Sequence, residues 1–172
     1  MELLKRFVAG DPDAFEALFR QHQAEVYRWI VRIVRDPGAA EDLTVETFWR
    51  VHRAHARFDA KGNWGAWLRR IATNASLDHL RRARREVELP EDLAAPAQAD
   101  GAVQSERHRQ IRRALHGLPP RLRIVAILSL IEEEPLERIA AALGISKGAA
   151  KLRLFRGERL LRKKLERIGV KP

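Results

Sequence analysis

The 172-residue sequence contains no cysteine. Disulfide frameworks, thiolate metal sites and cysteine nucleophiles are therefore excluded. Long apolar runs are also missing. The longest uncharged apolar stretch, residues 124–131, has eight residues, far below the ~20 that a membrane-spanning helix needs. The N-terminal residues show neither a long apolar segment nor an A-x-A cleavage site, so we expect a cytoplasmic protein without membrane insertion.

The charge is strongly one-sided. Lys and Arg number 33 against 23 Asp and Glu, for a formal net charge of +10. Residues 1–85 carry +5, residues 86–106 carry six acids and no base, and residues 107–172 carry +11. Such a balance makes a polyanion the first partner to consider.

The acidic middle segment divides the chain. It holds two prolines and a glycine and no aromatic residue, a composition typical of a linker. We therefore predict two basic domains, residues 1–87 and 106–172, joined by a flexible acidic linker over residues 88–105. The alternative is a solvated surface loop within one domain.

Both domains are predicted to be helical. Asp11-Pro12 and Asp36-Pro37 each place a capping acceptor before a proline at the first helical position. Apolar residues follow each signal at helical spacing, and a further helix follows a loop that ends in a predicted cap at Asn63. No segment alternates with a period of two residues, so the predicted fold class is all-α.

Residues 136–161 have the pattern of a helix-turn-helix. Gly144 can adopt positive φ at the turn, Ile145 fills the core, and Ser146 caps the second helix. On a helical wheel, residues 150, 154, 157 and 161 form the core side. The residues on the opposite side and its flanks are candidates for contact with duplex DNA: Lys147, Gly148, Lys151, Leu152, Arg153, Phe155, Arg156 and Arg159. Leu152 fits either a thymine methyl group or the surface of a polymerase or inhibitor.

Two motifs in the first domain add a family resemblance. They read A-E-D-L-T-V-E-T-F over residues 40–48 and A-W-L-R-R-I-A-T-N-A-S-L-D-H-L-R-R over residues 66–82. Both resemble region 2 of the extracytoplasmic-function (ECF) sigma factors of the sigma-70 family. L-P-P-R-L-R at residues 118–123 and the helix-turn-helix resemble region 4 of the same family. The resemblance covers nearly the whole chain in the expected order.

The resemblance implies a non-catalytic specificity subunit that binds core RNA polymerase and promoter DNA. Asp42 and Glu46 lie four residues apart in the part that meets the polymerase clamp coiled coil in the family, and they can pair with basic groups there. Ordinary solvated acids near a helix start are the alternative. Val45 stands where the family usually has glutamine.

The resemblance also implies that region 2 opens the −10 element as melted DNA while region 4 reads the −35 element as duplex. The helix after Trp64 is expected to present a stripe formed by Arg70, Asn74, Leu77 and Arg81, in which Asn74 matches the asparagine of the family's −10 surface. The preceding loop matches the loop that captures a flipped base, with Lys61, Gly62 and Asn63 as its polar residues. Phe58 or Trp64 either stacks on that base or belongs to the core.

Three further expectations come from the same reasoning. Asp78 is expected to fix a local arginine such as Arg82. The acidic linker either mimics nucleic acid in the polymerase channel or acts only as a spacer. An anti-sigma factor is expected to hold the protein inactive, as is common in the family.

Two other function classes were weighed. A free-standing helix-turn-helix regulator explains residues 107–172 but leaves the first domain unexplained. An enzyme such as a nuclease has little support, because the six histidines show no H-E-x-x-H spacing and no phosphate-binding loop occurs. We therefore expect no catalytic residue, no cofactor and no metal.

Overall fold

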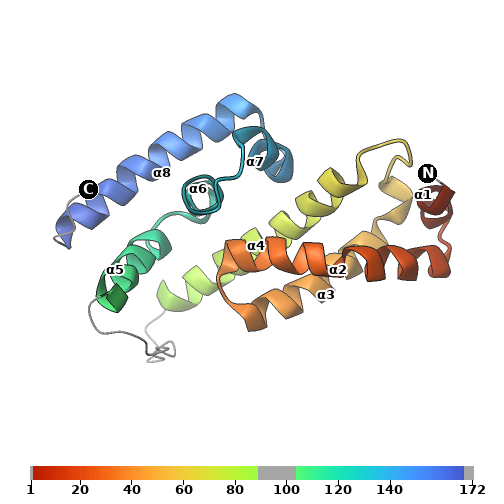
Figure 1. Ribbon diagram of the computed structural model, residues 1–172, viewed down its shortest axis with the longest axis horizontal. Helices are drawn as coiled ribbons and strands as arrows, with labels where there is room; N and C mark the ends of the chain where they lie inside the picture. The colour runs from red at the N-terminus through yellow and green to blue at the C-terminus, as the bar shows by residue number, and fades with distance from the viewer. Residues whose placement is uncertain (1, 89–103, 169–172) are drawn as a thin grey trace.

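The computed structural model describes residues 2–88 and 104–168 (Figure 1). All regular structure within these ranges is helical, which confirms the all-α prediction. The elements are α1 (Glu2–Val8), α2 (Pro12–Val34), α3 (Pro37–Arg53), the 3₁₀ turn η1 (His55–Arg57), α4 (Trp64–Glu88), α5 (Gln104–His116), α6 (Pro120–Ala126), the π-helical turn η2 (Ile127–Ile131), α7 (Leu136–Leu143) and α8 (Lys147–Arg167).

The helix starts follow the predicted caps. Asp11 Oδ1 accepts two backbone N–H groups of the first turn of α2, at 2.9 and 3.3 Å. Asp36 Oδ1 accepts one at the start of α3 at 3.1 Å, and Asn63 Oδ1 accepts one at the start of α4 at 3.0 Å. Each bond satisfies a donor that the helix itself leaves free.

Helices α2, α3 and α4 form the first domain, and α1 lies across one end of it. Apolar side chains of the three long helices make the core, and Ile30, Val51 and Leu68 are almost fully buried. A buried hydrogen bond ties two of the helices together: Trp29 Nε1 on α2 donates to Thr73 Oγ1 on α4 at 2.9 Å.

Helices α5 to α8 form the second domain. A small core of Leu115, Leu118, Ala126 and Ile127 lies between α5 and α6 and is extended by partly buried residues of α8. Gly157 lets α8 approach α6, because a Cβ there would lie 3.4 Å from the carbonyl oxygen of Leu122.

The two domains pack against each other. The main hydrophobic core continues from the first domain into the second, where it takes in Ile124, Val125 and Leu128 of the α6–η2 segment and Ile139 and Ala142 of α7. Helix α4 contacts α2 and α3 as well as α6 and α7 (Figure 1). The sequence predicted two domains but gave no sign of this contact.

Most of the predicted linker, residues 88–105, lies outside the described residues. The helices on either side reach slightly into it, since α4 ends at Glu88 and α5 begins at Gln104. The linker's flexibility and its two proposed roles therefore stay predictions.

Candidate DNA and polymerase interfaces

The predicted helix-turn-helix is formed by α7 and α8. Gly144 ends α7 in the left-handed conformation, with φ 64° and ψ 38°. Ser146 Oγ then accepts a hydrogen bond from the backbone N–H of Ala149 at 3.1 Å and caps α8. A glycine at positive φ followed by a capping serine gives the sharp turn that such a motif needs.

One face of α8 is open. Leu152 and Phe155 are 49% and 60% exposed, which is unusual for large apolar side chains on an amphipathic helix. Among the predicted −35 residues, Arg153 is half-buried. The others are exposed: Lys147, Gly148, Lys151, Leu152, Phe155, Arg156 and Arg159. The opposite side packs on the domain through Ala150 and Gly157, as predicted.

Two charges on this face are modified by their neighbours. Burial and the nearby guanidinium of Arg121 lower the pKa of Arg153. Lys147 forms an ion pair with Glu137 of α7, and its hydrogen bond lowers the pKa of the Glu137 carboxyl. Lys147 is therefore partly neutralised, whereas Lys151 has no ion pair with a described residue.

The predicted stripe on α4 is divided. Asn74 and Arg70 are exposed and Arg81 is half-buried, with Nη1 3.5 Å from Asp78 Oδ1. Leu77, by contrast, is only 7% exposed. Its side chain is therefore not accessible to DNA in this arrangement, and its expected contact with DNA stays a prediction. Leu77 lies two helical turns from Arg70 and so shares the side of α4 that faces the second domain.

The loop before α4 is compact and polar. Lys61, Gly62 and Asn63 are all exposed. The backbone N–H of Lys61 donates to Asp59 Oδ1 at 2.9 Å, and a Cβ at Gly62 would lie 2.9 Å from the carbonyl oxygen of Asp59. A side chain at Gly62 would therefore force this turn to shift.

Phe58 and Trp64 belong to the core. They are 5% and 8% exposed, and their rings meet edge to face at a centroid distance of 5.3 Å. Trp67 completes the cluster at 4.9 Å from Phe58. Neither ring is free to stack on a base in this arrangement. Of the two alternatives, the structure shows the core position, and the two rings support the loop between them.

The acids predicted to meet the polymerase differ in their surroundings. Asp42 is exposed, whereas Glu46 Oε1 accepts a hydrogen bond from Arg50 Nε at 2.8 Å. Arg50 also donates to Asp78 Oδ2 at 3.0 Å. Burial lowers the pKa of Arg50, but the bonds to Glu46 and Asp78 outweigh it and raise that pKa. Asp78 thus joins α4 to α3 through Arg50. Its local arginine partner is Arg81, at 3.5 Å, in place of Arg82.

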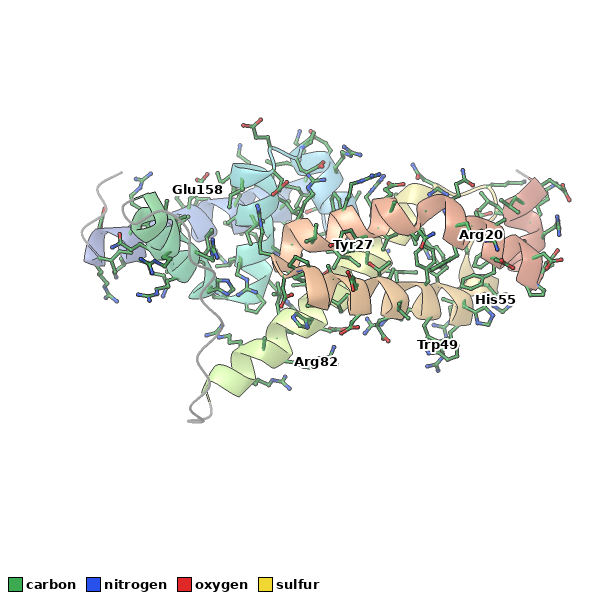
Figure 2. All side chains as sticks on the ribbon, turned by 60° about the horizontal axis from the view of Figure 1, so that its bottom comes forward. Arg20, Tyr27, Trp49, His55, Arg82 and Glu158 are labelled. Atoms are coloured by element: carbon green, nitrogen blue, oxygen red, sulfur yellow. The ribbon has the colours of Figure 1, made fainter. Side chains whose placement is uncertain are left out.

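Sequence reasoning missed an apolar part of α3. Val45 is 67% exposed and Trp49 is 57% exposed, and Figure 2 shows Trp49 projecting away from the helices. The His52 ring stacks on Trp49 at 6.0 Å. Asp42, Val45 and Trp49 follow one another at helical spacing, so they form a ridge of one acid and two apolar side chains. The signal was visible in the sequence as two large apolar residues off the core side.

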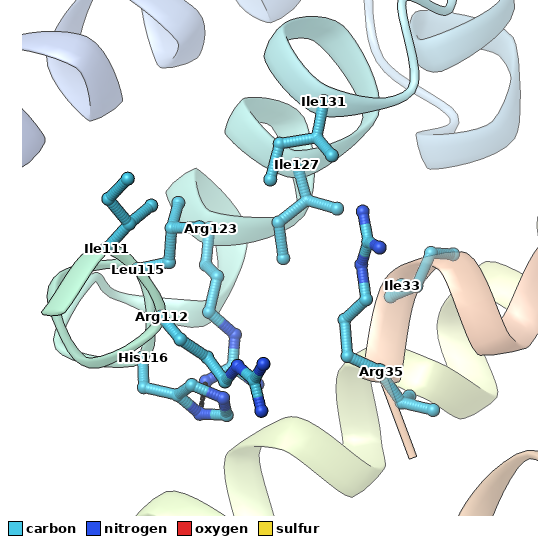
Figure 3. Close-up of a pocket in the computed structure, with 10 residues that line it drawn as sticks. Ile33, Arg35, Ile111, Arg112, Leu115, His116, Arg123, Ile127 and Ile131 are labelled. Carbon is cyan, nitrogen blue, oxygen red and sulfur yellow. Dashed lines mark hydrogen bonds between the residues drawn. The ribbon is translucent and has the colours of Figure 1, made fainter. Parts of the chain in front are cut away.

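A hollow of about 330 Å³ lies between the domains (Figure 3). Ile33 and Arg35 line it from the end of α2, and Arg112, His116 and Arg123 line it from α5 and α6. Arg123 is 7% exposed and lies 3.2 Å from His116 Nδ1. Arginine carries only donors, so Nδ1 is the acceptor and the imidazole proton sits on Nε2.

Within residues 2–88 and 104–168, no helix is long and apolar enough to cross a bilayer. The same part of the chain holds no group of three or more carboxylate or imidazole side chains placed to bind a metal ion.

Family models match both domains. "Sigma-70 region 2" matches residues 18–86, and "Sigma-70, region 4" matches residues 108–161. The first match contains the α3 ridge and the α4 stripe, and the second contains the helix-turn-helix.

Individual proteins match over nearly the whole chain. The sequence is 40% identical to RNA polymerase sigma factor CarQ of Myxococcus xanthus, covering 97% of this chain and 98% of CarQ. It is 30% identical to ECF RNA polymerase sigma factor SigW of Bacillus subtilis, covering 94% of each.

Two solved structures share the fold. One is CnrH in complex with the cytosolic domain of CnrY, with a TM-score of 0.59 and 24% identity over 95% of both chains. The other is the sigma factor RpoE in complex with the anti-sigma factor NepR from Bartonella quintana, with a TM-score of 0.55 and 24% identity over 88% of this chain and 96% of the other.

These matches confirm the resemblance drawn from the motifs. They also set aside a free-standing regulator and an enzyme, because a sigma factor is a non-catalytic subunit of RNA polymerase. The chain belongs to the ECF RNA polymerase sigma factors of the sigma-70 family.

Proposed function

We propose that the chain binds core RNA polymerase through α3, opens the −10 element with the loop and stripe of α4, and reads the −35 element with α8. The observation that carries the proposal is the open face of α8 behind a well-formed turn, on the same chain as a region 2 domain. Each domain contacts one promoter element. The polymerase, in the cytoplasm, holds the two domains at the distance that separates the −10 and −35 elements.

The α3 ridge supports a protein contact. Large exposed apolar side chains beside an acid are typical of a protein-binding surface. A tryptophan that is fixed by stacking on His52 loses little freedom on binding. We assign Asp42, Val45 and Trp49 to the polymerase interface, and Glu46 to an indirect role because Arg50 already engages its carboxylate.

The −10 surface is smaller than the sequence suggested. Asn74 offers both a donor and an acceptor to a base edge, and Arg70 and Arg81 suit phosphates. Lys61, Gly62 and Asn63 form the exposed edge of a rigid loop on which an unpaired base can lie. Phe58 and Trp64 contribute by holding that loop in place.

The −35 surface combines cations with two apolar groups. Lys151, Arg156 and Arg159 suit phosphates and guanine edges, and Leu152 and Phe155 suit thymine methyl groups. Control by an anti-sigma factor is part of the proposal, and it is supported by the sigma–anti-sigma complexes that share the fold.

Binding to core polymerase tests the proposal. Asp42→Asn is expected to weaken the affinity of the chain for purified core polymerase about tenfold, since it removes the negative charge that would pair with a basic group of the polymerase. Asp13→Asn makes the same chemical change at an exposed site on α2 and serves as the matched control. Equal affinities for the two variants, or a chain that binds duplex DNA tightly without polymerase, would contradict the assignment.

A further inference from the structure

Two turns, one from each domain, meet through ion pairs. Arg32 of α2 donates from Nε to Glu132 Oε2 at 2.9 Å and from Nη2 to Glu134 Oε1 at 2.6 Å. Arg35, just past the end of α2, also pairs with Glu132. Two arginines of region 2 thus hold two glutamates of region 4, about a hundred residues away in the sequence.

These pairs are partly shielded from water. The side chains of Glu134 and Glu132 are 8% and 18% exposed, and that of Arg32 is 28% exposed. Burial lowers the pKa of Arg32, but its hydrogen bonds to Glu134 and Glu132 outweigh this and raise the pKa. Charges at this depth are screened less than surface pairs, and a nearly buried carboxylate that loses its partner carries a desolvation penalty.

The backbone on both sides is strained. Among described non-glycine residues, only Arg35 and Glu133 have positive φ, at 61° and 52°. Side chains other than glycine rarely adopt this conformation, and it persists where surrounding contacts hold it. Both strained residues lie in the two turns that the ion pairs join.

The contact also covers part of the proposed −10 surface. A Cβ added to Gly144 would lie 2.9 Å from Arg70 Nε, so the guanidinium of Arg70 rests against the turn of the helix-turn-helix. Leu77, on the same side of α4, is buried. A DNA strand that follows the α4 stripe would meet the second domain at Arg70.

We propose that the pairs of Arg32 and Arg35 with Glu132 and Glu134 form a latch that keeps the free protein closed, with the turn of region 4 against Arg70 at one edge of the −10 surface of region 2. The latch opens when the chain joins polymerase and DNA. The closed state itself rests only on the contacts above, whereas its inhibitory effect rests on the proposed function.

The covalent chain permits opening. Residues 89–103 join α4 to α5, and a segment of that length can span at most ~50 Å. The domains can therefore separate without any helix unfolding. Because the latch is made of ion pairs, added salt favours the open state.

Single-molecule energy transfer on the full-length chain tests the latch. The sequence has no cysteine, so dyes can be attached at Ala24→Cys on α2 and Glu166→Cys on α8, both exposed. We expect a single closed population at low salt. An open population should grow as KCl is raised to about 0.5 M, where the Debye length is roughly 4 Å. Glu132→Gln/Glu134→Gln should raise the ratio of open to closed about five- to tenfold at low salt.

Glu133→Gln is the matched control. Glu133 lies between the two latch residues and is exposed, and it has no ion pair with a described residue. It should leave the populations unchanged, and circular dichroism should show the same helix content in all variants. Identical populations for wild type and the double variant at every salt concentration, or a wild type that is open at low salt, would overturn the latch.

A second measurement separates this inference from the proposed function. If both hold, the double variant binds core polymerase about five- to tenfold more tightly than wild type, by the same shift in population. If the populations shift but polymerase is bound equally well, the latch exists and its inhibitory role is wrong. If no variant binds polymerase, the proposed function fails while the energy-transfer result still decides the latch.

Discussion

A buried hydrogen bond connects two helices of the first domain, α2 and α4. The bond between Trp29 Nε1 and Thr73 Oγ1 is buried, and both residues are well below a tenth exposed. Thr73→Val keeps the shape of the side chain and leaves the indole N–H without its partner, so we expect a loss of about 1–2 kcal/mol in the free energy of unfolding. Urea denaturation measures it. Trp29→Phe combined with Thr73→Val should cost less than the sum of the single changes, and strict additivity would show that the bond contributes nothing.

His116 gives the second domain a dependence on pH. Burial, Arg123 and Arg112 lower the pKa of His116 below its usual value of 6.5. The unfolded chain therefore binds the proton more readily, so the stability present above pH ~6.5 falls as the pH drops toward the folded-state pKa. Protonation would also remove the acceptor for Arg123.

An NMR titration should place the pKa of His116 below that of an unstructured histidine. His116→Gln should flatten the dependence of thermal stability on pH between about 5 and 7. Parallel curves for wild type and variant would contradict this assignment.

At the scale of the element, α8 combines a structural cap with a binding face. Ser146→Ala removes the bond to the Ala149 N–H and should cost about 1 kcal/mol of stability. Ser146→Asp keeps an acceptor at the cap but adds a negative charge beside the DNA surface. It should therefore retain stability and bind promoter DNA within the polymerase complex more weakly. If both variants lose DNA binding in proportion to stability, α8 has no separate binding face.

A substitution in the α3 ridge should likewise affect polymerase binding without affecting the stability of the fold. Trp49 is 57% exposed, so Trp49→Ala should change the free energy of unfolding by no more than about 0.5 kcal/mol. At the centre of an interface the same truncation should weaken polymerase binding at least tenfold. Binding is measured with core polymerase, and denaturation with the free chain. An unchanged affinity would remove Trp49 from the interface.

Local signals in the sequence predicted the elements well. Asp11, Asp36, Asn63 and Ser146 each cap the helix that they were expected to cap, and Gly144 takes the positive φ expected of it. These features depend on a few neighbouring residues, so the sequence is sufficient for them. The α3 ridge was missed because Val45 was considered only as a departure from the family's usual glutamine, and Trp49 was not assigned to a side of its helix.

Contacts between residues far apart in the sequence could not be predicted in this way. A helical wheel puts Leu77 and Arg70 in one stripe beside the core face of α4. It shows neither the burial of Leu77 nor the contact of Arg70 with the turn at Gly144. Nothing in the letters E-E-E-P at residues 132–135 points to Arg32. Phe58 and Trp64 gave equal signals for core and stacking, and the burial of both rings decides between them.

At the scale of the whole molecule, closed and working arrangements make opposite demands. The closed one shares a core and ion pairs between the domains. The working one needs both DNA surfaces at once, since the −10 and −35 elements lie apart on a promoter. The proposed latch therefore implies that the domains separate before both DNA surfaces can act.

The division of labour is tested most directly by run-off transcription with core polymerase on a promoter library, followed by sequencing of the active templates. Wild type should select two motifs at a fixed spacing. Asn74→Ala should relax the −10 motif alone and Lys151→Ala the −35 motif alone, while Gln23→Ala and Lys163→Ala, exposed controls on α2 and α8, should change neither. Motifs that relax together in both variants, or remain intact in both, would contradict the account.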